Sequence, residues 1–482
     1  MIPYTIRTFR GGISDESDKG VSGAFKHGQS LNIHGRDDIL QCGSSVVTVD
    51  STTITDLIQY MVPSADGSLY CFGSTGSIYS VAGQKDDPAV TFIYNDESGE
   101  IKGAGEFQLS DGIRYMFWAT ATQYSRRDMS TGGKDYPWTN VTVNWKTDKI
   151  SSSAVWHPMA IASGSLMIGN EEGLSTVDFD GNFDPLRLNV RPGNRIKTLE
   201  ERGDYVVLGS DRSDGSEEGH IWSWIVTAQN YVQKKRIPVQ GVNTLVTTEN
   251  ALLQGGDNGE IFPADFENAV ALARIPGGGQ AYPAGSSILD DIAVFGIFGG
   301  TYPGIWSYGR KHKNRPNSLN YEYRLASTVA GSSISTIGAI SVLNGNLFAS
   351  WGTTDGSTSD YGVDQVSSTT RANAIYEGLE FDGGSPHLSK LVDSVALVMS
   401  PLVSGTSVSV KFKQNKETDW RYAVLGDATT TFSVANETMA IFNLGKPGRI
   451  YEVGVELNAS GASSPEIHAI VSYLSKETFE FA

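Results

Sequence analysis

The sequence predicts an all-β protein with about seven propeller blades, an N-terminal extended arm and a C-terminal β-sandwich. About seven copies of one strand-and-turn pattern recur at a spacing of roughly 40 to 53 residues, which matches one four-stranded blade. The composition also suits short strands joined by tight turns, with 54 Gly residues and only 19% charged residues. We therefore divide the chain into an arm (1–45), a propeller (46–375) and a sandwich (376–482).

The arm fits neither of the other two patterns. It contains FRGGISDESDKGVSGAFKHGQSLNIHG, which is Gly-rich and polar with isolated apolar residues, and such a segment is poorly equipped to fold alone. We expect it to lie along the propeller or a neighbouring subunit. The strand around Val46 to Val49 is our candidate for a blade shared between the two chain ends, which would lock the ring.

The propeller is predicted from its repeats and their turns. The clearest copy spans Trp156 to Val190; others begin near Leu57, Ile101, Arg195, Asn243, Ile288 and Ala339. The positive φ angles that hairpin turns require are supplied by Asp66-Gly67, Asp180-Gly181, Asn258-Gly259 and Asn344-Gly345. One such sheet cannot bury both faces, so we expect radial stacking of six to eight blades. A series of unrelated β-sandwiches is the alternative, but it does not explain the spacing.

The rhythm changes after about Ile375, where the strands become longer. Val408, Val410 and Phe412 alternate with polar residues, which is typical of a half-buried strand. About seven or eight strands in roughly 100 residues match a compact β-sandwich.

Composition limits the class of protein. No apolar stretch approaches the roughly 18 residues of a membrane span, and MIPYTIRTFRGGISDESDKG has no apolar run of the length that a signal peptide needs, so we expect a soluble protein made in the cytoplasm. Cys42 and Cys71 are then expected to be free thiols. The net charge of −17 disfavours non-specific nucleic-acid binding.

Acidic residues supply one candidate metal loop and several carboxylate pairs. Asp178, Asp180, Asn182 and Asp184 alternate like the start of a calcium loop, but no Glu closes it and Asp180-Gly181 lies where the repeat needs a turn. Whether this loop binds an ion stays open. We interpret the adjacent carboxylates as solvated loop residues: Asp86-Asp87, Glu217-Glu218 and Asp290-Asp291.

Histidines and glycine runs add no recognisable catalytic motif. Four histidines form no zinc-binding spacing: His27, His34, His157 and His220. Gly277-Gly278-Gly279 is predicted to link two blades, and no nucleophile elbow or phosphate loop is present. We expect a protein that is not an enzyme, with no catalytic residue, no cofactor and no metal site.

Aromatic and basic residues raise two binding hypotheses, although a structural role is favoured for both sets. Trp222 and Trp224 lie on one strand face and favour packing between blades over sugar stacking. Ser110-Asp111-Gly112 with Trp118 lacks the spacing of a sialidase-type aspartate box. Two basic clusters are candidates for contact with an acidic neighbour or a phosphate backbone, although solvated loops explain them too: Lys234-Lys235-Arg236, and Arg310-Lys311-His312-Lys313 with Arg315.

Both ends of the chain resemble structural proteins of tailed-bacteriophage virions. FRGGISDESDKGVSGAFKHGQSLNI resembles the Gly-rich starts of phage tail and connector proteins that continue into a propeller. KLVDSVALVMSPLVSGTSVSVKFKQNKETDWRYAVLG, followed by AIFNLGKPGRIYEVGVEL, resembles their C-terminal β-sandwich. The resemblance covers the two ends, and the middle by architecture only. It implies a virion component of the tail, tip or collar that docks to other subunits.

Three functions follow for testing. The first is a non-enzymatic structural or adaptor protein of the virion, present as a symmetric homo-oligomer, contacting other virion subunits and binding neither membrane nor specific nucleic acid. The second is a receptor-binding protein that recognises host glycan, with Trp420 and Trp222 as candidate contacts. The third is a propeller-fold glycoside hydrolase, which needs paired carboxylates at the ring centre.

Overall fold

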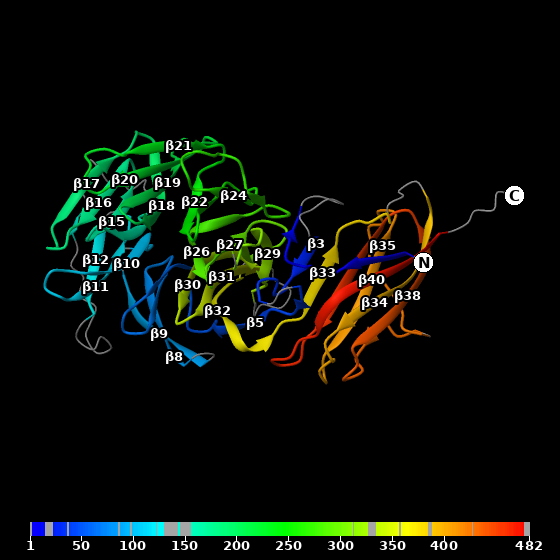
Figure 1. Ribbon diagram of the computed structural model, residues 1–482. Helices are drawn as coiled ribbons and strands as arrows, with labels where there is room; N and C mark the ends of the chain where they lie inside the picture. Colours follow the sequence, from blue (N-terminus) through cyan, green and yellow to red (C-terminus); the bar gives the residue numbers. More distant parts are fainter. Residues whose placement is uncertain are drawn as a thin grey trace. The chain divides into compact units, whose positions relative to one another are not determined.

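The protein is built from strands. The computed structural model describes residues 2–14, 23–35, 38–84, 87–96, 99–121, 123–129, 143–144, 156–311, 313–325, 334–355, 358–383, 388–426 and 428–476. Every regular element in these ranges is a β-strand, in agreement with the predicted all-β class (Figure 1).

Seven four-stranded antiparallel sheets follow one another along the chain, and we call them blades 1 to 7. Blades 1 to 3 contain β6 (Ile58–Pro63), β7 (Leu69–Gly73), β8 (Ser77–Gln84) and β9 (Asp87–Asn95); β10 (Gly103–Gln108), β11 (Arg114–Ala119), β12 (Gln123–Asp128) and β13 (Val143–Asn144); and β14 (Met159–Ala162), β15 (Ser165–Asn170), β16 (Gly173–Val177) and β17 (Phe183–Asn189). Blades 4 and 5 contain β18 (Asn194–Arg202), β19 (Tyr205–Arg212), β20 (Gly219–Ile225) and β21 (Gln233–Ile237); and β22 (Val242–Thr247), β23 (Ala251–Gly255), β24 (Glu260–Pro263) and β25 (Ala273–Arg274). Blades 6 and 7 contain β26 (Gln280–Leu289), β27 (Ile292–Phe298), β28 (Gly304–Gly309) and β29 (Ser318–Tyr323); and β30 (Ile334–Leu343), β31 (Asn346–Asp355), β32 (Thr358–Arg371) and β5 (Ser44–Asp50).

The seven blades confirm the predicted propeller, and blade 7 closes it. Its strand order is β30-β31-β32-β5, so its last strand comes from the N-terminal part of the chain. This strand contains Val46 to Val49, the segment that the sequence suggested for this role. Closure leaves no blade incomplete, so the ring has no unpaired end.

Hydrophobic residues fill the spaces between consecutive blades. Trp222 and Trp224 of blade 4 pack with Met167 and Leu174 of blade 3. Ile221 and Ile237 on the opposite face of blade 4 pack with residues of blade 5. Because each sheet buries both faces against its neighbours, the radial stacking expected from the repeats is what the structure shows.

Two further sheets form the second architectural element, the β-sandwich. One sheet has the order β1-β40-β34-β38 with β4 beside β40, and the other has the order β2-β3-β33-β39-β35-β36 with β37 beside β35. Their bounds are β1 (Ile2–Ile6), β4 (Leu40–Gln41), β34 (Lys390–Met399), β38 (Met439–Gly448) and β40 (Glu466–Lys476); and β2 (Gly12–Ile13), β3 (Ala24–Gln29), β33 (Ala374–Gly378), β35 (Ser407–Gln414), β36 (Arg421–Tyr422), β37 (Thr431–Phe432) and β39 (Tyr451–Asn458). The Tyr451 hydroxyl on β39 donates a hydrogen bond of 2.6 Å to the carbonyl of Lys390 on β34, which links the two sheets.

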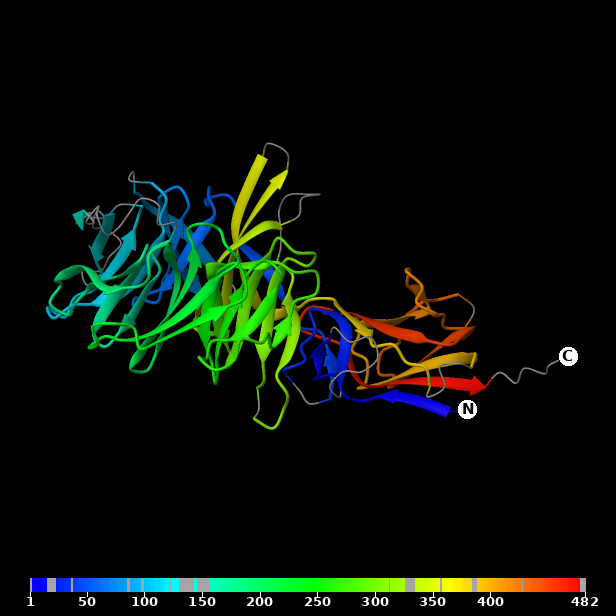
Figure 2. The ribbon, with the colours of Figure 1, turned by 90° about the horizontal axis from the view of Figure 1, so that it is seen from above.

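The N-terminal segment, expected to lie along the propeller, also contributes strands to this sandwich. It does contact blade 6, where the side chain of Asn320 on β29 donates a hydrogen bond of 2.9 Å to the carbonyl of Leu31. Ile2 to Ile6 pair with Leu474 to Ile470, so the first and last strands are neighbours, as Figure 2 shows. β3 pairs with β33 in the other sheet. The arm was expected because its apolar residues are sparse, but Phe25 and Leu31 are fully buried. This segment therefore pairs with strands that lie more than 300 residues later in the chain.

The chain divides into two compact units. One comprises Met1–Val46, Trp306–Arg324 and Val366–Ala482, and the other comprises Val47–Ile305 and Leu325–Gln365. The first unit contains the sandwich together with β29 and most of β28; the second contains most of the propeller. The expected boundary at 375–376 therefore lies close to the passage from blade 7 into β33.

A candidate anion-binding cluster on blade 4

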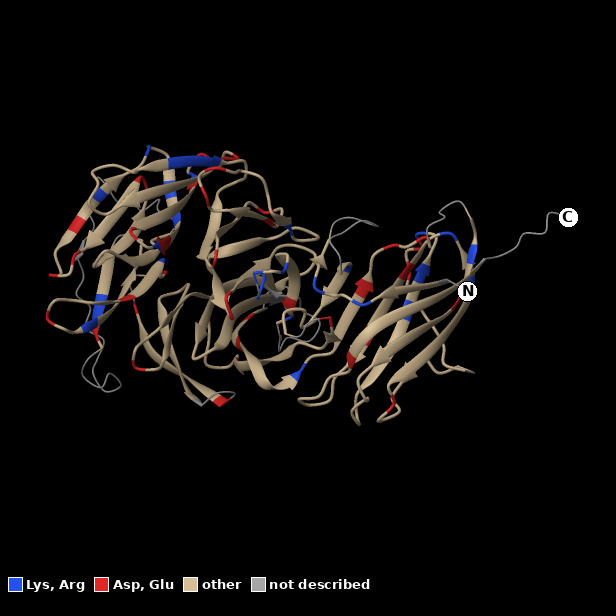
Figure 3. Cartoon of the chain, in the orientation of Figure 1, with Lys and Arg blue, Asp and Glu red and all other residues tan. Residues whose placement is uncertain are grey.

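Basic side chains gather at one end of blade 4, where Figure 3 shows β21 in blue. This is the end at which each blade passes into the next, and it also carries the turn between β19 and β20. Arg191 lies on the passage from blade 3, Arg212 ends β19, and Lys234 and Arg236 lie on β21. All belong to the same compact unit.

The register of β20 and β21 sorts the predicted basic triplet onto two faces. His220 is opposite Arg236, and Trp222 is opposite Lys234, so these four side chains share one face. Lys235 is opposite Ile221 and points the other way, where its Nζ lies 3.5 Å from a carboxylate oxygen of Asp265 in blade 5. Only two of the three basic residues therefore belong to one surface.

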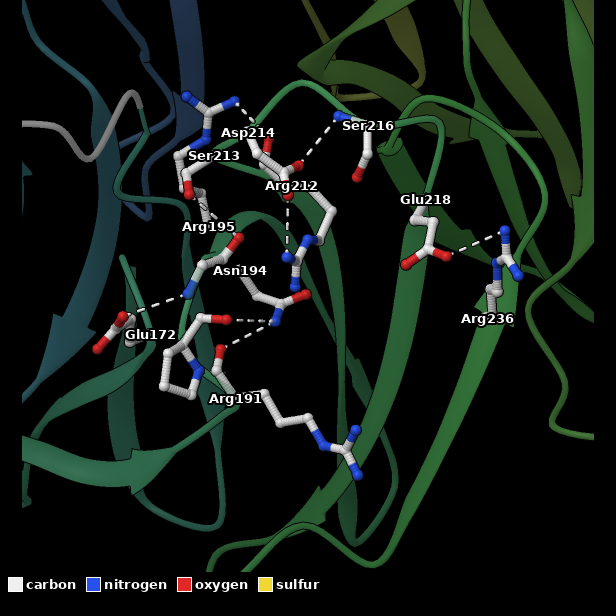
Figure 4. Close-up of polar contacts among 12 residues, drawn as sticks. Glu172, Arg191, Asn194, Arg195, Arg212, Ser213, Asp214, Ser216, Glu218 and Arg236 are labelled. Carbon is white, nitrogen blue, oxygen red and sulfur yellow. Dashed lines mark hydrogen bonds and ion pairs between the residues drawn. The ribbon is translucent and has the colours of Figure 1, made fainter.

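Backbone hydrogen bonds hold the segment that connects blades 3 and 4 in place. Gly193 takes a positive φ of 77°, its N–H donates to Glu172 Oε1 at 3.2 Å, and its carbonyl accepts from Ser213 N–H at 2.9 Å. The Asn194 amide donates to the carbonyl of Arg191 at 2.8 Å (Figure 4). These contacts fix the Arg191 backbone, while its side chain is exposed.

Arg212 and Arg236 each have one carboxylate partner. Arg212 lies 3.0 Å from Asp214, and Arg236 lies 3.0 Å from Glu218. The hydrogen bond from Arg212 lowers the pKa of Asp214, and Ser216 N–H also donates to this carboxylate. The guanidinium of Arg191 has no ion pair or hydrogen bond within the described part of the chain, and in Figure 4 the dashed line at Arg191 ends on its backbone carbonyl and not on its guanidinium.

His220 lies among these cations and is only 5% exposed. Burial lowers the pKa of its imidazole to about 4, and Lys234, Arg212 and Arg236 act in the same direction, whereas Glu218 opposes them. Lys234 lies over the Trp222 ring at 4.5 Å, and burial together with Arg191 lowers its pKa. We call Arg191, Arg212, Lys234, Arg236 and His220, with Asp214 and Glu218, the His220 cluster.

The His220 cluster carries more positive than negative charge. Its four cations face two carboxylates, which leaves a local charge of +2 in a chain whose net charge is −17. An uncompensated positive surface of this kind attracts anions. Neither the ion pairs nor the cation–π contact uses the Arg191 guanidinium or the Nδ1 atom of His220.

The aromatic candidates contribute to packing. Trp222 and Trp224 are fully buried, and the Trp222 indole donates to Ser210 Oγ at 3.1 Å, so neither ring offers a free face to a sugar. Trp118 is buried too, and its indole donates to Asp96 at 2.6 Å. Trp420 is partly exposed, but the ammonium groups of Lys411 and Lys413 lie 4.9 and 4.8 Å from its ring centroid.

Several of the acidic candidates in the described part of the chain lie in hairpin turns. Asp178 accepts hydrogen bonds from the backbone and side chain of Asn182 at 2.8 and 3.0 Å, and Gly181 has a φ of 81° in the β16–β17 turn. Asp290 and Asp291 form the two-residue β26–β27 turn with φ angles of 49° and 65°. Asp111 accepts from Ile113 N–H in the β10–β11 turn. Asp86 lies outside the described residues.

The remaining histidines are dispersed. His157 is fully buried and its Nδ1 lies 2.9 Å from the carbonyl of Gly169. His27 on β3 is opposite Glu377 of β33, and burial lowers its pKa. Within the described residues, no group of three or more His, Cys, Asp or Glu side chains is arranged to hold a metal ion.

His34 belongs to a Ser–His–Glu group with the wrong geometry for nucleophilic catalysis. Ser307 donates to Glu322 at 2.7 Å, while His34 Nε2 lies 3.4 Å from Ser307 Oγ and 3.5 Å from the same carboxylate. A nucleophile needs the base to accept its proton and the acid to contact the other ring nitrogen. Ser307 is also only 1% exposed, so this group stabilises the fold of its own unit.

The second basic cluster holds its own loop together. Arg310 donates to the backbone carbonyls of Lys313 and Arg315 at 3.0 and 3.4 Å, and His312 lies outside the described residues. Gly277, Gly278 and Gly279 all take positive φ and join blade 5 to blade 6, as predicted. Cys42 and Cys71 are free and buried, which confirms the predicted thiols. The described residues contain no helix able to cross a membrane.

Comparison with known proteins leaves the family of this chain undetermined. No protein-family model matches it. No curated protein matches it either. Solved structures similar to this chain include U3-55K (TM-score 0.45, 11% identity, 67% of this chain and 100% of that chain), the WD40 β-propeller domain of Doa1 (0.43, 11%, 66% and 96%) and "YCF48 bound to D1 peptide" (0.43, 9%, 67% and 95%). Because these TM-scores and sequence identities are low, the propeller assignment rests on the seven four-stranded sheets of this chain.

Part of the His220 cluster is visible in the sequence. Lys234 and Arg236 stand out as basic residues and His220 as an isolated histidine. Arg191 and Arg212 lie 43 and 22 residues before Lys234 by sequence number, and no local pattern connects them with it. The repeat is the signal that could have joined them, because it brings the start of the first strand, the end of the second, the start of the third and the end of the fourth to the same end of each blade.

Proposed function

We propose that this chain is a non-enzymatic docking component of a tailed-bacteriophage virion, which binds other virion subunits through protein–protein contacts. The observation that carries the docking function is the His220 cluster, a positively charged surface on an otherwise acidic propeller. Its backbone is held by hydrogen bonds at Gly193 and Asn194, so little ordering is needed when a partner binds. Charge of opposite sign on the partner would guide its approach.

The virion setting rests on the resemblance of the two chain ends to phage tail and connector proteins. In the structure these two stretches contribute strands to one sheet: β2 and β3 come from the first, and β35 and β39 from the second. Segments that resemble one class of protein and also fold together support a common origin. We extend the proposal to a symmetric homo-oligomer, as expected for a component repeated around a tail.

Glycan recognition, the alternative function, loses one of its two candidate contact residues. Trp222 is fully buried, so substitution there would act through packing. Trp420 keeps partial exposure and is the residue on which that alternative depends. No observation favours the third alternative, a glycoside hydrolase.

Mass spectrometry of purified particles tests the virion assignment. We expect the chain in the particle at a fixed copy number, and its absence would overturn the assignment. Docking is tested by incorporation of the charge-reversal variant Lys234→Glu/Arg236→Glu into particles. We expect incorporation to fall several-fold, because a complementary contact becomes repulsive.

Arg274→Glu is the matched control. Arg274 lies on β25, the fourth strand of blade 5, opposite Glu260 at the start of β24. It therefore occupies the position in blade 5 that corresponds to Arg236 in blade 4. Equal incorporation of both variants would contradict a role for the His220 cluster in docking.

A further inference from the structure

His220 presents a buried hydrogen-bonding atom without a partner. Nδ1 of its imidazole has less than 1 Å² of exposed surface and no hydrogen-bond partner in the described part of the chain. Nε of Arg212 has the same status. A buried polar group without a hydrogen-bond partner is energetically unfavourable, so two such groups in one cluster call for an explanation.

Cations surround both atoms on three elements, and the β19–β20 turn carries two carboxylates. Lys234 and Arg236 of β21 and Arg212 of β19 lower the pKa of His220, and Arg191 of the blade passage lowers that of Lys234. Glu218, in the β19–β20 turn, is the carboxylate that faces His220. Asp214 accepts from the NH2 nitrogen of Arg212, which leaves the Nε donor of the same guanidinium unused.

We propose that the His220 cluster is a binding site for one oxyanion, held by Nδ1–H of His220, Nε–H of Arg212 and the guanidinium of Arg191. A carboxylate or a phosphate-like group supplies the acceptors that these donors lack. A single divalent anion would also neutralise the local charge of +2 that follows from four cations and two carboxylates. This inference deepens the proposed docking function, because acidic side chains of a partner carry the same oxyanion chemistry.

Binding is expected to be linked to a proton. In the free protein His220 is neutral at pH 7, because its pKa lies at about 4. An adjacent anion favours the imidazolium, so the pKa of His220 rises in the complex. The complex then binds more protons than the free protein between these two pKa values, and the affinity increases as the pH falls through that range.

Sulfate is the probe, since its charge is constant across the range studied. We would titrate the full chain at low ionic strength and follow the His220 imidazole resonance by NMR, with calorimetry in parallel. We expect saturable binding that strengthens about threefold or more from about pH 7.5 to about pH 5. His220→Gln should remove most of this pH dependence. Arg191→Gln should weaken binding about tenfold, as expected for a charged donor.

Arg191→Gln also guards against misfolding, because the Arg191 side chain is exposed. Arg274→Gln removes the same charge from the corresponding end of blade 5 and should leave sulfate binding unchanged. The proposal is overturned if sulfate does not move the His220 resonance. It is equally overturned if Arg191→Gln and Arg274→Gln weaken binding by the same factor, since that result would indicate unspecific attraction.

A second titration with a hexaglutamate peptide distinguishes the two sources of the oxyanion. Competition of the peptide with sulfate would indicate an acidic protein segment, whereas sulfate binding without competition would indicate a small free anion. Either outcome requires the site. Because these measurements use the isolated chain, loss of the protein from purified particles would contradict the proposed virion role and leave this site standing.

Discussion

Glu200 is a carboxyl group that the fold keeps away from water. It lies on β18, the first strand of blade 4, and accepts a hydrogen bond from Thr247 N–H at 3.0 Å. Burial raises its pKa to about 7, although this hydrogen bond favours the charged form. The unfolded chain ionises this group near pH 4.3, so folding binds a proton between about pH 4.3 and 7.

We predict that Glu200→Gln stabilises the protein above pH 7. Wild-type stability from this group is complete below pH 4.3 and is lost as the pH rises to 7, because the buried charge is then unfavourable. Gln keeps the acceptor and stays neutral, so the gain should be about 2 kcal/mol at pH 8 and near zero at pH 4. Urea unfolding at both pH values would measure it. A pH-independent gain would contradict the burial of this carboxyl.

Gly103 lies where the backbone of another segment approaches closely. A Cβ at this position would lie 1.6 Å from the backbone carbonyl oxygen of His157, whereas a Cβ at Gly105 would lie 3.2 Å from its nearest neighbour, Met159 Cβ. We predict that Gly103→Ala lowers the free energy of unfolding by about 3 kcal/mol, as expected for a forced backbone shift. Gly105→Ala, on the same strand, should cost less than half as much. Thermal melts of the two variants compare them directly.

At the scale of elements, two hairpin turns solve one problem with different residues. Asn344-Gly345 and Asp290-Asp291 each join their strands through two residues with positive φ. Type I′ turns favour Asn-Gly, and an aspartate in this region is strained. The first turn was therefore predictable from its sequence. The second was not, because Asp-Asp also occurs in ordinary acidic loops.

We predict opposite effects when the second residues of these turns are exchanged. Asp291→Gly should stabilise the protein by about 0.5 to 1 kcal/mol, because Gly takes a φ of 65° without strain. Gly345→Asp should destabilise it by a similar amount, since φ there is 76°. Chemical unfolding of both variants gives the two signs. Equal signs would show that something other than φ controls these turns.

Sequence periodicity also describes β35 only in part. Val408, Val410 and Phe412 are buried as predicted, but Ser409 and Lys411 on the other face are buried too. Lys411 is compensated by Glu377 at 2.7 Å, a residue of β33 that lies 34 positions earlier in the chain. A polar residue in an alternating pattern normally indicates solvent. An ion pair with a residue of another strand allows Lys411 to be buried, so the alternating pattern alone does not show whether such a polar residue is buried or exposed.

At the scale of the molecule, the propeller could be predicted because its repeats encode local contacts. The sandwich strands of the N-terminal segment could not be predicted, because their partners are distant in sequence. Each blade is made by hairpins whose strands are neighbours in sequence. β1 and β4 instead pair with β40, and β3 pairs with β33. These short segments show no sequence period that would indicate a partner. The sequence indicated only part of the His220 cluster for the same reason, because Arg191 belongs to the segment that connects two blades.

We predict that removing residues 2–50 disturbs the propeller, whereas removing residues 2–6 does not. The longer deletion takes away β5, the closing strand of blade 7, and the shorter one removes only β1 from the sandwich. Trp351 on β31 of blade 7 is fully buried and donates to Asp364 at 2.7 Å. Hydrogen exchange of residues 346–355 should accelerate strongly in the longer deletion. Protection retained in that variant would contradict closure by β5.

The pairing of β1 with β40 sets a timetable for synthesis. Ile2 pairs with Leu474, so more than 400 residues must be synthesised after β1 before its partner strand exists. At ordinary elongation rates this wait lasts roughly half a minute or more. The blades, made of local hairpins, have time to form during that interval. β1 therefore remains unpaired on the nascent chain until β40 is made, and throughout that interval it is exposed to aggregation and to chaperones.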